Sequence, residues 1–302
     1  MIALENISKK FNSKIVVDNI SIKIKKGEIV GLLGPNGAGK TTTLRMITGV
    51  LPPTKGNIKI DGIDLEAEPT LKKRIGFLPE NNPLYDEMTV EENLNFWSAI
   101  KGISKNKKKE AIEFVVENCG IAEVFYRPIN ELSKGYRQRV GFSQAILTKP
   151  DILILDEPTE GLDPNQRQDI SRLIRQLGKD RTVIISSHVL GELSKIANRM
   201  VIIHKGRIVA DDTPDNLKRL GKDSLTVEIE VKGKKVMSFI KKIDGVIKVI
   251  KQRKNYYIIE VDKRYDVREK LYKLSVENGW TLLTLFSKER AIEDVFGELT
   301  NN

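Results

Sequence analysis

The octapeptide GPNGAGKT, residues 34–41, follows a short apolar run at residues 29–33. It satisfies the pattern G-x-x-x-x-G-K-[ST], which forms a phosphate-binding loop where it leaves a strand and opens a helix. Residues 41–48 contain no helix breaker before Gly49, so a helix is expected to follow the loop. Glycines let main-chain N–H groups close on phosphate oxygens, and the helix N-terminus adds positive potential. The sequence therefore predicts a strand–loop–helix unit that binds nucleotide phosphates.

Each polar residue of this loop has an expected role. Lys40 would reach the β- and γ-phosphates as a point charge, and the Thr41 hydroxyl would coordinate Mg²⁺. The alternative is an ordinary strand–turn–helix that binds no ligand. The residues expected to contact the nucleotide are Gly34, Pro35, Asn36, Gly37, Ala38, Gly39, Lys40, Thr41 and Thr42.

A second motif, ILILDEP, occupies residues 152–158. Its apolar strand would deliver Asp156 at the carboxyl end, which is the ligand edge of an open α/β sheet. Asp156 would hold Mg²⁺ directly or through water, and Glu157 would polarise the attacking water as general base. Two acids after a strand could also be plain loop acids, but beside a phosphate-binding loop they indicate ATP hydrolysis with Mg²⁺.

Apolar strands alternate with helical patterns over most of the first 220 residues. Strands are expected near residues 20–24, 29–33, 75–78, 152–155, 182–186, 200–203 and 207–210, and helices near 41–48, 90–101, 111–118, 165–177 and 189–198. This alternation predicts an α/β fold with a mainly parallel sheet covered on both faces. Residues of about 80–150 are mostly helical in pattern and are expected to form a helical subdomain.

The domain boundary is expected at Leu220-Gly221, after a short helix that follows Thr213-Pro214. Residues 1–220 would form the nucleotide-binding domain and residues 221–302 a small α+β domain. Strands are expected in the latter near residues 225–231, 246–250, 256–261 and 281–286, and helices near 235–243, 267–278 and 290–299. The order β-α-β-β-α-β is ferredoxin-like, and a small barrel is the alternative.

Composition excludes several classes of protein. No stretch approaches the roughly 18 to 20 apolar residues of a membrane-spanning helix, and the first ten residues lack a signal-peptide core, so a cytoplasmic protein is expected. Cys119 is the only cysteine, and His204 matches no motif and is expected to be structural. The net charge of +10 is shared by both parts of the chain. At the lysine run of residues 105–109 a solvated helix start is favoured over an anionic-surface contact.

Three further motifs carry a family resemblance. LSKGYRQRV, residues 132–140, resembles the LSGGQ signature of ATP-binding cassette (ABC) proteins and lies between the two nucleotide motifs, as in that family. EGLDP, residues 160–164, resembles the family's D-loop, and SSHVL, residues 186–190, resembles its switch-histidine loop. The resemblance spans about residues 1–220 and implies a P-loop cassette with antiparallel N-terminal strands and a helical subdomain.

The resemblance also implies roles for single residues. Phe11 would stack on adenine, with a core-facing phenylalanine as the alternative. Ser133 and Gly135 would cap the γ-phosphate of ATP held by the opposite subunit, and Ser133 also suits the N-cap of the helix that follows. His188 would sense the γ-phosphate, and Asp163 would cross the dimer interface.

The chain departs from the family pattern at three positions. Lys134 and Tyr136 stand where the commonest signature has Gly and Gln, so the contact across the dimer should differ in detail. Glu80 stands where the family has Gln, in the loop after residues 75–78. Glu80 is expected to join Thr41 and Asp156 at the metal, and the alternative is that it points to solvent.

The function implied by the resemblance is that of the ATPase subunit of an ABC transporter of the drug-export branch, with ATP and Mg²⁺ as cofactors. It would work with a separate transmembrane permease subunit and a second ATPase subunit, peripherally on the cytoplasmic face of the membrane, and no nucleic acid is expected. The region at residues 79–97 would dock onto the membrane subunit, and the alternative for Phe96 and Trp97 is that they belong to the core of the helical subdomain. Alternatives are a soluble ABC ATPase acting on ribosomes or DNA, and a nucleotide-sensing regulator.

Overall fold

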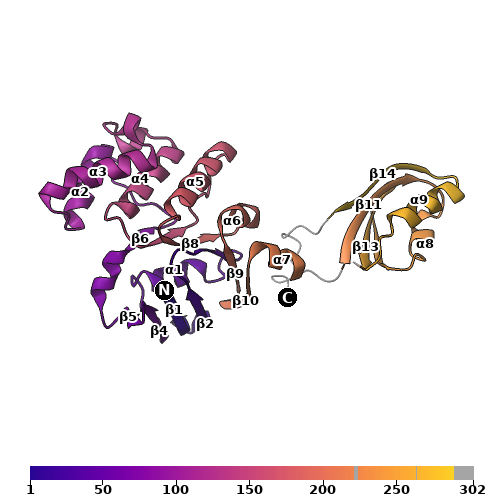
Figure 1. Cartoon of the computed structure of the whole chain (residues 1–302), viewed down its shortest axis with the longest axis horizontal. Coiled ribbons are helices and arrows are strands. Elements are labelled where there is room, and N and C mark those ends of the chain that lie inside the picture. Colours follow the sequence, from indigo (N-terminus) through magenta and orange to yellow (C-terminus); the bar gives the residue numbers. More distant parts are fainter. Residues whose placement is uncertain (221–223, 263, 289–302) are drawn as a thin grey trace. The chain divides into compact units, whose positions relative to one another are not determined.

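The computed structural model describes residues 1–220, 224–262 and 264–288 (Figure 1). The chain forms two compact units, Met1–Pro214 and a second that begins at Asp215. Each unit has its own hydrophobic core. None of the helices in the described ranges is both long enough and apolar enough to cross a lipid bilayer.

The first unit contains two sheets. The antiparallel sheet has the order β2-β1-β4-β5 and comprises β1 (Ile2–Phe11), β2 (Lys14–Ile24), β4 (Lys55–Ile60) and β5 (Ile63–Asp64). The larger sheet has the order β10-β9-β3-β8-β7-β6 and comprises β3 (Ile29–Leu33), β6 (Ile75–Leu78), β7 (Ile152–Asp156), β8 (Thr182–Ser187), β9 (Arg199–His204) and β10 (Arg207–Asp212). All its pairings are parallel except that of β9 with β10. The predicted α/β fold with a mainly parallel sheet is confirmed.

Strands β3, β7 and β8 are buried along their whole length, because helices cover the sheet. Helix α1 (Lys40–Ile47) packs against β7 and β8, and α6 (Leu190–Ile196) packs against β3 and β8. A side chain at Gly31 would meet Leu193 at 3.2 Å, so a glycine in β3 lets α6 lie close to the sheet. Helix α5 (Pro164–Leu177) packs against α6.

The carboxyl ends of the parallel strands lie side by side. Leu33 at the end of β3 pairs with Ser187 at the end of β8, and Ser186 pairs with Asp156 at the end of β7. Ligands of open α/β sheets bind outside this edge. The sheet therefore gathers the loops that follow β3, β7 and β8 at one place.

The residues between β6 and β7 are mostly helical, as the sequence predicts. The elements are α2 (Val90–Ile100), α3 (Lys105–Cys119), η2 (Ala122–Val124), η3 (Ile129–Glu131) and α4 (Lys134–Ile146), after a short η1 (Pro69–Arg74) that precedes β6. The helix expected near residues 111–118 begins at Lys105, so the lysine run of residues 105–109 is a helix start, as the sequence favoured. Thr89 and Glu92 form a capping box at the start of α2, and α4 packs against β6.

The second unit has an antiparallel sheet of order β12-β13-β11-β14. Its elements are β11 (Ser224–Lys232), α8 (Val236–Ile240), β12 (Val246–Arg253), β13 (Tyr256–Asp262), α9 (Arg268–Glu277) and β14 (Thr281–Lys288), and α7 (Pro214–Leu220) precedes them. This is the predicted β-α-β-β-α-β order, and within the described residues β12 and β14 form the two edges of an open sheet. The helix expected at residues 235–243 ends earlier, at Ile240. The helix expected at residues 290–299 lies outside the described residues.

Candidate functional site

The loop between β3 and α1 can form only with glycine at two positions. A Cβ atom at Gly34 would lie 2.3 Å from the main-chain oxygen of Ile203 in β9. Gly39 has a φ of +107°, and a Cβ atom there would lie 2.8 Å from the main-chain oxygen of Val16 in β2. The loop is therefore held closely against strands of both sheets, with α1 starting immediately after it.

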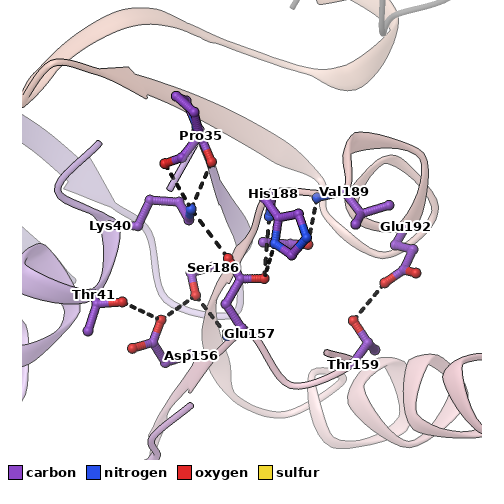
Figure 2. Close-up of polar contacts among 12 residues, drawn as sticks. Pro35, Lys40, Thr41, Asp156, Glu157, Thr159, Ser186, His188, Val189 and Glu192 are labelled. Atoms are coloured by element: carbon purple, nitrogen blue, oxygen red, sulfur yellow. Dashed lines mark hydrogen bonds and ion pairs between the residues drawn. The ribbon is translucent and has the colours of Figure 1, made fainter. Parts of the chain in front are cut away.

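Lys40, the first residue of α1, lies at the centre of the site (Figure 2). Its Nζ donates to the main-chain oxygen of Gly34 at 2.7 Å and to that of Pro35 at 3.4 Å. The same ammonium lies 3.3 Å from Oε1 of Glu157, and both side chains are buried. The lysine is thus held by its own loop and by the acid that follows β7.

Asp156 is buried at the end of β7 and receives two hydroxyl groups. Thr41 donates from Oγ1 to Asp156 Oδ1 at 3.1 Å, and Ser186 donates from Oγ to the same oxygen at 2.6 Å. Ser186 also accepts from the main-chain N–H of Glu157 at 2.9 Å. Ser186 orients both acids, a role that the sequence motif SSHVL did not indicate.

Glu157 occupies a left-handed backbone position with a φ of +46°, which turns the chain sharply after β7. Its Oε2 lies 3.0 Å from His188 Nδ1 and accepts from the main-chain N–H of His188 at 3.4 Å. Its Oε1 forms the ion pair with Lys40 but accepts no hydrogen bond of good geometry from the described residues. Strained backbone of this kind is concentrated at functional sites. The carboxylate is therefore positioned by histidine on one side and by Lys40 on the other.

A cavity of about 250 Å³ opens beside these groups. It is lined by Val16, Asn36, Gly37, Ala38, Gly39, Lys40, Thr41, Thr42, Glu80, Glu157 and Glu160. Burial raises the pKa of Glu80, and the charges of Asp156, Glu160 and Glu157 raise that pKa further, although the side chain keeps contact with solvent. The cavity therefore has a basic loop on one side and an excess of carboxylates on the other.

The structure brings the phosphate loop, Asp156, Glu157 and His188 together. The expected residues that lie apart from this group and do not line the cavity are Phe11, Ser133, Gly135 and Asp163. Phe11 is exposed at the end of β1. Ser133 caps α4 by accepting from the main-chain N–H of Tyr136, as predicted, and Gly135 lies in the first turn of that helix. Asp163 caps α5 by accepting two main-chain N–H groups at 3.0 Å.

The two departures in the signature make contacts of their own. Tyr136 donates from its hydroxyl to Glu123, and this hydrogen bond raises the pKa of Tyr136. The Lys134 side chain lies against Gly161. A Cβ atom placed on Gly161 would be 2.0 Å from Lys134 Nζ. Both side chains thus contact other segments of the same chain.

Sequence reasoning missed several polar residues that hold these loops. Gln138 donates to the main-chain oxygen of Pro158, and Asn82 donates to Gln138. Thr159 donates to Glu192 in α6. Gln138 could have been found from the sequence as a polar residue on the buried face of α4. Thr159 and Glu192 could not, because their pairing depends on the fold.

Comparisons with known proteins agree with this geometry. Residues 17–160 match the sequence model of the ABC transporter family. The chain is 36% identical to the bacitracin transport ATP-binding protein BcrA of Bacillus licheniformis, over 99% of this chain and 97% of that protein. It is 39% identical to the linearmycin resistance ATP-binding protein LnrL of Bacillus subtilis, over 77% and 76%.

A solved structure similar to this chain is the dimeric post-hydrolysis state of the ATP-binding cassette MJ0796 bound to ADP and Pi. It has a TM-score of 0.64 and 26% identity, and the match covers 71% of this chain and 99% of that one. The phosphate loop, the acids after β7 and the histidine after β8 are thus found in a chain whose relatives bind ATP. The chain belongs to the ABC transporter family as an ATP-binding subunit, and it is an ATPase.

Proposed function

We propose that this chain hydrolyses Mg-ATP in a site completed by a second cassette, and that hydrolysis drives export through a separate membrane subunit. The observation that carries this proposal is the position of Glu157 (Figure 2). Its carboxylate lies 3.3 Å from Lys40 Nζ and 3.0 Å from His188 Nδ1, at the wall of a cavity formed by the phosphate loop. A general base must lie within hydrogen-bond reach of the water that it activates.

The protein groups at the expected metal position fit Mg²⁺. Thr41 Oγ1 and Asp156 Oδ1 are oxygen atoms 3.1 Å apart that would both face the ion. Mg²⁺ prefers oxygen, uses one or two carboxylates and fills its remaining positions with phosphates and water. No cluster of three or more His, Cys, Asp or Glu side chains in the described part of the chain could hold a metal ion. A magnesium ion held largely by the nucleotide accords with this donor set, and when bound it would neutralise charge on the phosphates.

The residues of this chain would then act in sequence. Lys40 would leave the Glu157 carboxylate for the β- and γ-phosphates, because two phosphate charges attract the ammonium more strongly than one carboxylate. Glu157, freed from the lysine, would accept a proton from the attacking water. The water oxygen bonds to the γ-phosphorus while the bond from that phosphorus to the β–γ bridging oxygen breaks, giving ADP and inorganic phosphate. His188 would hold the carboxylate and contact the γ-phosphate.

A second cassette would supply the groups that the cavity lacks. Ser133 and Gly135 lie at the N-terminus of α4, where main-chain N–H groups favour an anion. They do not line the cavity of their own chain. We assign them to the γ-phosphate of ATP held by the other cassette, with Asp163 at the interface and Phe11 on adenine. Glu80 would be the third protein group near the metal.

Export is proposed from the names of the relatives, which describe bacitracin transport and linearmycin resistance. The membrane subunit would meet the cassette at residues 79–97. Tyr85, Phe96 and Trp97 form an aromatic cluster there, with ring centroids 5.2 Å apart for the first pair and 5.9 Å for the second. Tyr85 is 49% exposed, so this cluster is not simply core. The chain would therefore lie at the cytoplasmic face of the membrane.

Glu157→Gln tests this function. The substitution keeps the size of the side chain and removes the base, so ATP binding should persist while hydrolysis falls by about 100-fold or more. Light scattering with Mg-ATP should show the variant as a dimer. Glu117→Gln, an exposed acid on α3, is the matched control and should hydrolyse ATP like the wild type.

Two results would contradict the proposal. A Glu157→Gln variant that stays monomeric with Mg-ATP would exclude the shared site, and one that hydrolyses ATP normally would exclude Glu157 as base. Co-purification separates the cellular alternatives, since a polytopic membrane protein supports transport and a ribosome or DNA supports the soluble class.

A further inference from the structure

The segments that follow β7 and β8 are joined at two points (Figure 2). The first joint is the contact of Glu157 with His188 at 3.0 Å. The second lies two residues beyond Glu157 and four residues beyond His188, where Thr159 donates from Oγ1 to Glu192 Oε2 at 2.6 Å. Thr159 and Glu192 do not line the nucleotide cavity. The second joint therefore connects the same two segments without belonging to the reacting groups.

Glu192 uses both of its carboxylate oxygens on other elements. While Oε2 accepts from Thr159, Oε1 accepts from Arg167 Nη1 in α5 at 2.8 Å. Arg167 in turn donates from Nε to the main-chain oxygen of Leu162 at 2.8 Å. One carboxylate thus holds the loop after β7 at two places, at Thr159 directly and at Leu162 through the arginine. Hydrogen bonds to ionised groups are about twice as strong as neutral ones.

Stabilisation of helix α6 alone does not account for this arrangement. Glu192 lies in the first turn of α6, where an acid is favoured by the helix dipole. That effect requires no partner, yet both oxygens are engaged and the side chain is only 18% exposed. Thr159 is buried, with 7% of its surface exposed, so loss of its acceptor would leave a hydroxyl unsatisfied.

We propose that Glu192 is a positioning residue that couples the segment after β8, which carries His188, to the loop at residues 158–163. The inference rests on the proposed function, in which His188 contacts the γ-phosphate and Asp163 faces the second cassette. When His188 and α6 shift on ATP binding, Glu192 moves Thr159 and Arg167 with them. The loop that ends at Asp163 then reaches the interface only while ATP is bound.

The test compares Glu192→Ala, Glu192→Gln and the double variant Thr159→Val/Glu192→Ala with the wild type in the full chain. Glu192→Ala should lower kcat by about 10- to 100-fold, as expected for misplaced catalytic groups, while KM for ATP stays within about twofold. Glu192→Gln should fall between Glu192→Ala and the wild type, because its amide oxygen still accepts from Thr159. The double variant Thr159→Val/Glu192→Ala should be no slower than Glu192→Ala alone, because both changes break the same contact.

Asp211→Asn is the control for loss of an ion pair. Asp211 accepts from Arg199 Nη2 at 2.7 Å on the β9–β10 hairpin, and neither of these described residues lines the nucleotide cavity. The thermal unfolding midpoint of Asp211→Asn should fall, while its kcat and its KM for ATP remain those of the wild type. A purely structural role of Glu192 predicts the same pattern for Glu192→Ala.

The proposal is overturned if Glu192→Ala keeps the kcat of the wild type, or if Asp211→Asn loses kcat equally. It is also overturned if Glu192→Ala, added to Glu157→Gln, leaves ATP-driven dimerisation unchanged in light scattering. Failure of the proposed function is a different outcome, since Glu157→Gln alone would then hydrolyse ATP or fail to dimerise. If Glu157→Gln dimerises fully and Glu192→Ala hydrolyses ATP at the normal rate, only the proposed role of Glu192 is excluded.

Discussion

Gln138 donates from Nε2 to the main-chain oxygen of Pro158 at 2.9 Å, which ties helix α4 to the residue after Glu157. Through Oε1 the same side chain accepts from Asn82 Nδ2 at 3.3 Å. Asn82 lies in the loop after β6 and also donates to the main-chain oxygen of Arg137. The buried amide of Gln138 therefore connects the loop after β6, helix α4 and the loop after β7.

Replacement of this amide should destabilise the chain. Gln138→Met conserves size but leaves the oxygen of Pro158 and the amide of Asn82 with fewer partners, so the free energy of unfolding should fall by about 1 to 3 kcal/mol. Urea unfolding measures the change. Gln168→Met on the exposed face of α5 is the control and should stay within about 0.5 kcal/mol of the wild type. Equal unfolding midpoints for the two variants would mean that the Gln138 amide contributes nothing.

Lys40→Ala should remove most of the affinity for ATP. Among the residues that the structure describes, Lys40 supplies the only side-chain cation that lines the cavity, and a hydrogen bond to a charged group contributes about 1.5 to 3 kcal/mol. A loss of about 2 kcal/mol corresponds to roughly a 30-fold rise in Kd. Calorimetric titration measures Kd, and circular dichroism checks that the fold is intact. Unchanged Kd in a folded variant would remove Lys40 from the site.

The aromatic cluster formed by Tyr85, Phe96 and Trp97 should contact the membrane subunit. A photo-crosslinking amino acid at position 85, in the assembled complex, should label that subunit. Tyr272 of the second unit is similarly exposed and is the matched control position. Labelling of the membrane subunit from position 272 and not from position 85 would contradict docking through this region.

Cys119 should resist alkylation while the chain is folded. The thiol is fully buried, and burial raises its pKa to about 12. The reactive species is the thiolate, and at pH 8 a thiol with that pKa is deprotonated in about one molecule in 10,000. Mass spectrometry after iodoacetamide treatment should show unmodified native protein and full modification in guanidinium chloride. Native protein that reacts as fast as the unfolded control would show that the thiol is accessible.

Much of the nucleotide site could be predicted because its residues lie in short local motifs. Strand β7 was evident from consecutive apolar residues that end at Asp156. The contact of Glu157 with His188 could not be read in the same way. These residues are 31 positions apart, and they meet because the parallel pairing of β7 with β8 places Asp156 opposite Ser186. Motifs identify the groups, whereas strand register brings them together.

Helix ends were predicted less well, and the reasons are local. Helix α3 begins at Lys105, as the lysine run indicated, although its first turn lacks the apolar spacing from which residues 111–118 were expected to be helical. Helix α8 ends at Ile240. The apolar pattern continues to Ile243, since that side chain packs against the core of its unit from beyond the helix. Apolar residues thus report burial more reliably than they report the end of a helix.

Glu80 is the departure from the family pattern that bears most directly on the metal. It lines the cavity with Glu157 and Glu160, and burial together with the charges of Asp156, Glu160 and Glu157 raises its pKa. Like charges gathered in one place raise each other's pKa and are unfavourable until a cation binds. A carboxylate at this position keeps the acceptor role of the family's glutamine and strengthens it towards Mg²⁺, while the N–H donor is lost.

We therefore expect Glu80 to be coupled to the metal. Glu80→Gln restores the family residue and should remain substantially active. Glu80→Ala removes the acceptor and should raise the Mg²⁺ concentration needed for half-maximal ATPase activity. A magnesium titration of the wild type and both variants at saturating ATP measures this shift. Identical dependence on Mg²⁺ in all three proteins would mean that Glu80 points to solvent and takes no part in the metal site.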